Sequence, residues 1–113
     1  MRVEISAINA IRTYTTSEVA VGTWEGQTLY RKVFTHSATG SSSFSVNGVT
    51  VINVRRMSAI IKTQGTYMTQ PYYTNAGDWW NYYLQSNGNC YLRGAGGFEQ
   101  AEYTFWLTLE YIH

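Results

Sequence analysis

The strongest pattern in the sequence is a strict alternation of large apolar and polar side chains near its end. The large apolar side chains occupy the odd-numbered positions, here called the apolar parity: Tyr103, Phe105, Leu107, Leu109 and Tyr111. Successive side chains on a strand point to opposite faces, so this alternation predicts a strand over residues 102–111 with its apolar parity in the core. Trp106 is on the other, more polar face, where it either covers a neighbouring element or enters a subunit contact.

Shorter alternating segments, separated by turn residues, occupy the rest of the chain. Glycine adopts positive φ without steric cost, and Asn-Gly between β-formers favours a type I′ turn. The stretch 36–43, which is rich in Ser, Thr and Gly, is predicted to be a loop. Three turn signals predict hairpins: Glu25-Gly26, Asn47-Gly48 and Ser86–Asn89.

These segments predict an all-β chain. No ten-residue stretch shows a helical period with caps, and eight or so short strands follow one another with turns at regular spacing. The prediction is a single domain over residues 1–113, folded as an antiparallel β-sandwich with jelly-roll-like connections. Residues 1–13 form either an N-terminal connection or an extra strand, and a short helix over 5–11 also fits their pattern.

The composition narrows the classes of partner. Charged residues make up 13% of the 113 residues, against about 25% in an average domain. Aromatic residues make up 16%, and the net charge is +1. A surface of hydroxyls and amides suits an obligate oligomer, an uncharged ligand, or both. The small net charge provides no attraction to nucleic acid, and no apolar run is long enough to span a bilayer, so neither partner is predicted.

The titratable residues predict neither a metal site nor a cofactor. The two histidines, His36 and His113, are far from each other in the sequence and from the lone Cys90, whereas metal sites cluster such ligands. A single cysteine excludes an internal disulfide framework and indicates folding in a reducing cytosol. We therefore expect Cys90 to be a small buried apolar side chain.

Residues 67–91 combine many aromatic rings with amides. Rings offer large contact area at low entropic cost and match the C–H faces of sugars, while amides and carboxylates match sugar hydroxyls. Adjacent aromatics on a strand point to opposite faces, so about half of these rings are expected in the core or an interface. The predicted glycan-binding residues are Tyr72, Tyr73, Asn75, Asp78, Trp79, Trp80, Asn81 and Tyr83.

A small glycan-degrading enzyme is an alternative, because two carboxylates beside aromatic rings can cleave a glycosidic bond. Asp78, next to Trp79 and Trp80, would act with Glu99 or Glu102. A domain of this size rarely builds a deep cleft, and the sequence contains no nucleophile motif, so no enzyme is predicted.

Three blocks of the sequence carry recognisable motifs: Tyr14–Val21, Gly22–Lys32 and Tyr103–Tyr111. Together they resemble a small module of bacteriophage tail and virion-appendage proteins. In that family a Tyr-Ser-Thr-Ser-Glu opening leads to a Gly-Thr-Trp turn motif, and a β-rich body closes on Tyr-x-Val-Thr-Leu-x-Tyr. In this chain Glu25-Gly26 replaces a longer acidic turn, and Thr28 stands where proline is usual.

The resemblance implies a homotrimer carried on the virion, at the tip of a tail fibre, baseplate or head fibre. Such a module is made in the host cytoplasm, contacts other virion proteins, and acts at the host cell surface. Together with the aromatic residues, the resemblance predicts a receptor-binding module for host glycans. The alternative within the same family is a structural capping or trimerisation domain that binds no glycan.

Overall fold

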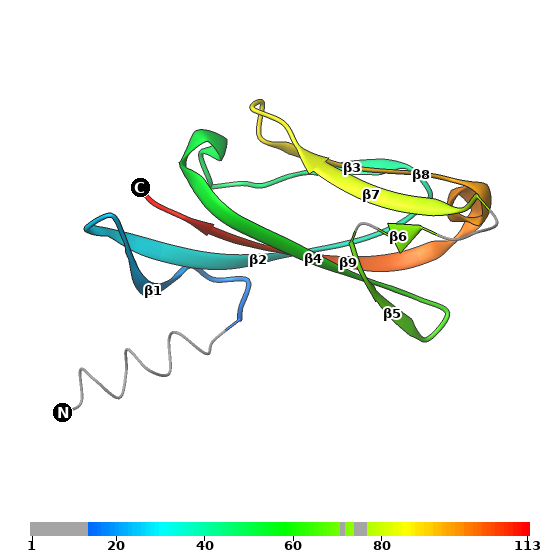
Figure 1. Cartoon of the computed structure of the whole chain (residues 1–113), viewed down its shortest axis with the longest axis horizontal. Coiled ribbons are helices and arrows are strands. Elements are labelled where there is room, and N and C mark those ends of the chain that lie inside the picture. Colours follow the sequence, from blue (N-terminus) through cyan, green and yellow to red (C-terminus); the bar gives the residue numbers. More distant parts are fainter. Residues whose placement is uncertain (1–13, 71, 74–76) are drawn as a thin grey trace.

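Nine strands form the protein, as seen in a computed structural model that describes residues 14–70, 72–73 and 77–113 (Figure 1). The strands are β1 (Val19–Trp24), β2 (Gln27–Thr39), β3 (Ser42–Ser45), β4 (Val54–Thr63), β5 (Thr66–Thr69), β6 (Tyr72–Tyr73), β7 (Trp79–Leu84), β8 (Asn89–Ala95) and β9 (Glu102–Tyr111).

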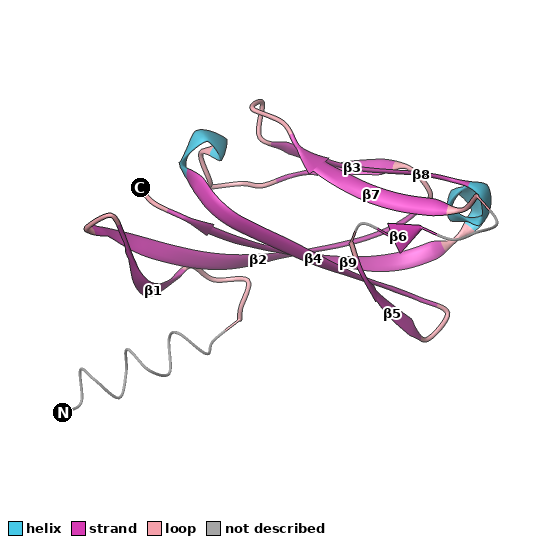
Figure 2. Ribbon diagram, viewed as in Figure 1, coloured by secondary structure: helices cyan, strands magenta, loops and turns pink. Residues whose placement is uncertain are grey.

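Two antiparallel sheets face each other in a sandwich-like arrangement (Figure 1). Sheet A has the order β1-β2-β9-β4-β5, and sheet B has the order β3-β8-β7-β6. Two short 3-10 helices, η1 (Val51–Asn53) and η2 (Gly96–Gln100), lie near opposite ends of the sandwich (Figure 2). The prediction of an all-β sandwich is confirmed. Residues 1–13, for which a connection or an extra strand is predicted, lie outside the described residues.

The predicted final strand is the centre of sheet A. β9 pairs with β2 on one side and β4 on the other. Its apolar parity faces sheet B, where Phe105, Leu107 and Leu109 are fully buried. The core prediction is confirmed for all five apolar positions of this strand, because alternation assigns one parity to the space between the sheets.

Two of the predicted hairpins are confirmed. Glu25 and Gly26 both have positive φ, 48° and 81°, which is the type I′ pattern whose twist matches the strands β1 and β2. Residues 85–88 join β7 to β8, and the Gln85 N–H donates to the Asn89 carbonyl at 2.9 Å. Turn chemistry therefore predicts these two connections correctly.

Two other predictions are wrong. Residues 36–39, within the predicted loop, extend β2, because each finds a backbone partner on β9 and the Ser37 and Thr104 hydroxyls lie 3.2 Å apart. Asn47-Gly48 does form a turn, but no hairpin follows it. Val46 and Val49 are both buried there, and the chain crosses from sheet B to η1 and then to β4 in sheet A.

A buried ion pair lies on the outer face of sheet A. The Arg31 Nε and Nη2 atoms donate to Glu110 Oε2 at 2.8 and 2.7 Å, and the two residues are only 7% and 8% exposed. The Tyr14 ring lies 4.1 Å from the Arg31 guanidinium carbon, and the Val33 N–H donates to the Thr15 carbonyl at 2.8 Å. The segment before β1 thus shields this pair from water.

Candidate functional site

Strand β7 divides the predicted glycan-binding residues between two environments. Trp80 is buried and packs against Tyr72 and Phe98, with ring centroids 6.0 and 5.3 Å away. Trp79 and Tyr83, on the opposite parity, are 36% and 42% exposed. The alternation expected of adjacent aromatics is therefore observed, and it leaves only one parity of β7 accessible to a ligand.

The inward group lies at the open edge between the sheets. Tyr72, Asp78 and Trp80 line a hollow of about 280 Å³ there, together with residues of β5 and η2. Asp78 Oδ1 accepts a hydrogen bond from the Gly97 N–H at 3.0 Å. This carboxylate therefore helps to fix η2 against β7, and the Trp80 ring is largely covered by protein.

The outward group is extended by the neighbouring strand. Tyr83 pairs with Tyr91 and Asn81 with Arg93 in the β7–β8 register. The Tyr83 and Tyr91 rings stack at 5.2 Å with an interplanar angle of 17°. The Arg93 guanidinium carbon lies 5.1 Å from the Tyr91 centroid, within the range of a cation–π contact.

Polar groups surround these rings. The Asn87 Nδ2 atom donates to the Tyr91 hydroxyl at 3.4 Å, and hydrogen bonds from the side chains of Asn87 and then Asn89 lower the pKa of Tyr91. On β3, Ser43 pairs with Tyr91 and so shares its face of the sheet. We call this outer surface of sheet B the sheet B face. It consists of Ser43, Trp79, Asn81, Tyr83, Tyr91 and Arg93.

The remaining predicted residues are placed as follows. Asn75 lies outside the described residues, and the structure describes the backbone of Tyr73 in β6 but not its side chain. Tyr91 and Arg93 join the face although they were not predicted as site residues. Counting outward from the turn signal at 86–89 would place Tyr83 opposite Leu92, whereas the observed register places it opposite Tyr91, so the hairpin signal alone could not have found them.

Within the described residues, the candidate metal-binding and catalytic side chains make separate contacts. Among the described residues, no group of three or more His, Cys, Asp and Glu side chains could hold a metal ion. The carboxylates of the glycosidase alternative make separate contacts: Glu99 accepts from the Ser41 hydroxyl at 2.9 Å, whereas Asp78 bonds the backbone of η2. Among residues 14–70, 72–73 and 77–113, no helix is long and apolar enough to cross a membrane.

Comparison of the chain with protein-family models, curated proteins and solved structures finds no match.

Proposed function

We propose that this protein is a host-surface-binding module of a bacteriophage virion appendage, and that it binds glycans on the sheet B face without catalysis. The observation that carries the proposal is the stacking of exposed Tyr83 on half-buried Tyr91, bordered by an arginine, amides and a serine hydroxyl. Stacked rings supply an apolar platform for sugar C–H groups, and the neighbouring donors and acceptors satisfy sugar hydroxyls.

The virion assignment comes from the motif resemblance over residues 14–111. The same resemblance supports a homotrimer, and the sandwich has a topology compatible with jelly-roll-like connections, because the chain passes between the sheets after β2, β3, β5 and β8. Several copies facing the cell would convert weak single sites into strong attachment through multivalency. We expect the gene to lie beside tail or capsid genes.

A structural role as a capping or trimerisation domain is the second candidate. The observation that favours it is the exposure of large apolar side chains on the outer face of sheet A. Ile60 is 46% exposed and Tyr67 is 63% exposed, and exposed apolar surface of this kind is typical of an interface. In this role the chain would assemble with copies of itself and ignore host glycans.

Binding to an array of bacterial capsule and cell-wall polysaccharides tests the proposal. Tyr83→Ala removes an exposed ring and leaves the core intact, so we expect unchanged folding and at least a tenfold loss of affinity, as for a central contact worth about 1.4 kcal/mol or more. Ile52→Ala is the matched control, because Ile52 is 82% exposed but lies in η1, away from the sheet B face.

The control variant should bind as the wild type does. Equal binding by Tyr83→Ala and the wild type would refute the sheet B face as the binding site. Trimerisation without binding to any polysaccharide or host cell would favour the structural role instead.

A further inference from the structure

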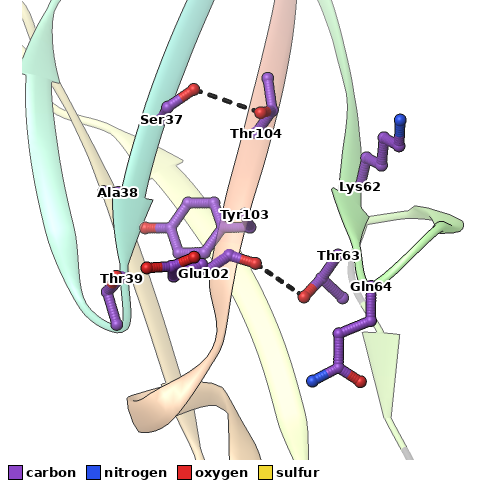
Figure 3. A pocket seen from close by; sticks show the side chains of 9 residues that line it. All are labelled: Ser37, Ala38, Thr39, Lys62, Thr63, Gln64, Glu102, Tyr103 and Thr104. Carbon is purple, nitrogen blue, oxygen red and sulfur yellow. Dashed lines mark hydrogen bonds between the residues drawn. The ribbon is translucent and has the colours of Figure 1, made fainter.

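A second hollow lies on the outer face of sheet A, opposite the sheet B face. Its volume is about 480 Å³. The floor is the beginning of β9, and the walls come from the end of β2 and from β4 with the turn that follows it (Figure 3). The side chains that line it include Ser37, Thr39, Lys62, Gln64, Glu102 and Thr104.

Two polar side chains of this hollow, those of Glu102 and Gln64, are available to a ligand. Within the described part of the chain, neither the Glu102 carboxylate nor the Gln64 amide has a hydrogen-bond or ion-pair partner. Figure 3 shows the Glu102 side chain directed toward Thr39 on β2, while Lys62 and Gln64 stand on the β4 side. The hollow thus presents the Glu102 carboxylate as an acceptor on the β2 side, and the Lys62 ammonium and Gln64 amide as donors on the β4 side.

The floor and the β4 wall are fixed by short contacts. The Thr63 hydroxyl donates to the Glu102 carbonyl at 2.8 Å, which ties the start of β9 to the end of β4. The Ser37 and Thr104 hydroxyls lie 3.2 Å apart across the β2–β9 pair (Figure 3). The polar groups therefore stand on paired strands of a sheet, apart from Gln64, which lies in the tight turn after β4.

An aromatic platform continues the hollow along β9. Trp106 lies two residues after Thr104 and so shares its face, and its ring stacks with Tyr67 of β5 at 6.3 Å and 21°. Lys62 Nζ lies 5.2 Å from the Tyr67 centroid and joins the polar hollow to the rings. Beyond them, a further hollow of about 420 Å³ is lined by Val33, Ile60, Tyr67, Trp106 and Thr108, with Tyr14 at its border.

We propose that this groove along β9 is a second saccharide-binding site, which takes an extended sugar chain. One sugar unit lies in the polar hollow against Glu102, Lys62 and Gln64, and a following unit lies on the Trp106–Tyr67 platform. A carboxylate, an ammonium group, an amide and hydroxyls beside stacked rings match the alternating hydroxyl and C–H surfaces of such a chain.

A subunit contact is the competing occupant of this face. The cores of protein interfaces are depleted of charged residues, whereas Lys62 and Glu102 both line the hollow. This favours a hydroxyl-rich ligand at the polar end. With sites on both outer faces, one copy of the chain would engage two sugar chains, or two segments of one chain, and gain avidity.

The polysaccharide array described above separates the two sites. Tyr67→Ala removes an exposed ring, and Glu102→Gln replaces the carboxylate by an amide of the same shape. Glu99→Gln is the matched control, because Glu99 is an exposed carboxylate that bonds Ser41 outside the groove. We expect at least a tenfold loss of affinity for Tyr67→Ala, a several-fold loss for Glu102→Gln, and no change for Glu99→Gln.

The outcomes distinguish this inference from the proposed function. If Tyr67→Ala and Glu102→Gln both bind as the wild type does while Tyr83→Ala does not, the second site is refuted and the sheet B face stands. If only the groove variants lose affinity, the second site stands and the sheet B face is refuted. If Tyr67→Ala lowers the mass measured by light scattering and leaves binding intact, the groove is a subunit contact. If the wild type binds no polysaccharide, both sites are refuted.

Discussion

Removing the carboxylate of the buried ion pair should destabilise the protein strongly. In the wild type, two Arg31 nitrogens bond a single oxygen of Glu110 at 2.8 and 2.7 Å, and Arg56 Nη1 lies 3.6 Å from the other oxygen. The variant Glu110→Gln keeps the shape of the side chain but removes its charge. The Arg31 guanidinium then stays in a site that is only 7% exposed and loses the carboxylate that its Nε and Nη2 atoms bond.

The size of the expected loss of stability in Glu110→Gln follows from the burial of Arg31 and Glu110. Breaking a buried pair by removing one partner costs about 3–5 kcal/mol, mostly from the uncompensated charge that remains. Domains unfold with only about 5–15 kcal/mol in total, so the loss should be a large fraction of the stability. Replacing both partners by apolar residues, as in Arg31→Met with Glu110→Leu, removes the uncompensated charge and should recover at least half of the loss.

Urea unfolding followed by tryptophan fluorescence measures these changes as a shift of the midpoint at constant slope. Glu102→Gln is the matched control, because it lies on the same strand and face but is exposed. That control should change the free energy of unfolding by about 0.5 kcal/mol or less. A loss under about 1 kcal/mol for Glu110→Gln, or a double variant no more stable than the single one, would refute the reasoning.

Two further predictions concern buried groups. Burial raises the pKa of the Cys90 thiol from 9.0 to about 12. Because the pKa is higher in the folded state than in the unfolded state, the stability that the buried neutral thiol contributes is present below pH 9 and is lost as the pH rises toward 12. Between pH 9 and 12, the urea midpoint should fall less steeply with pH for Cys90→Ala than for the wild type. An equal fall in both proteins would contradict the assignment of this pH dependence to Cys90. Trp80→Ala should cost about 3–5 kcal/mol because Trp80 packs in the core, whereas Trp79→Ala, on the exposed parity, should cost about 1 kcal/mol or less. Thermal unfolding compares the two variants, and equal losses would show that the two parities do not differ in burial.

Local patterns predicted the final strand and two of the three expected hairpins. The alternation over 103–111 is long enough to identify the core face of β9, and Glu25-Gly26 has the turn chemistry of a tight hairpin. The loop predicted at 36–43 failed because its serines and threonines have low apolar content but pair across β9, which is 60 or more residues away in the sequence. Local composition cannot report such a partner.

The candidate site could be predicted only in part for a similar reason. Alternation indicated that Trp79 and Trp80 face opposite ways, but it could not say which of them is buried, because the neighbouring sheet decides this. The groove on sheet A was missed altogether: Lys62, Tyr67, Glu102 and Trp106 come from three strands, and only the order β9-β4-β5 brings them together. The alternation places Trp106 on the more polar face of the final strand, but it could not identify Tyr67 as the ring that stacks on it.

The central claim is that the sheet B face binds a glycan, and an amide-resolved NMR titration tests it most directly. The ¹⁵N-labelled protein is titrated with a soluble fragment of the polysaccharide that binds most strongly on the array. We expect saturable shifts at Trp79, Asn81 and Tyr83 on β7 and at Tyr91 and Arg93 on β8, reduced at equal ligand concentration in Tyr83→Ala. Saturable shifts that leave all of these amides unmoved would contradict the account.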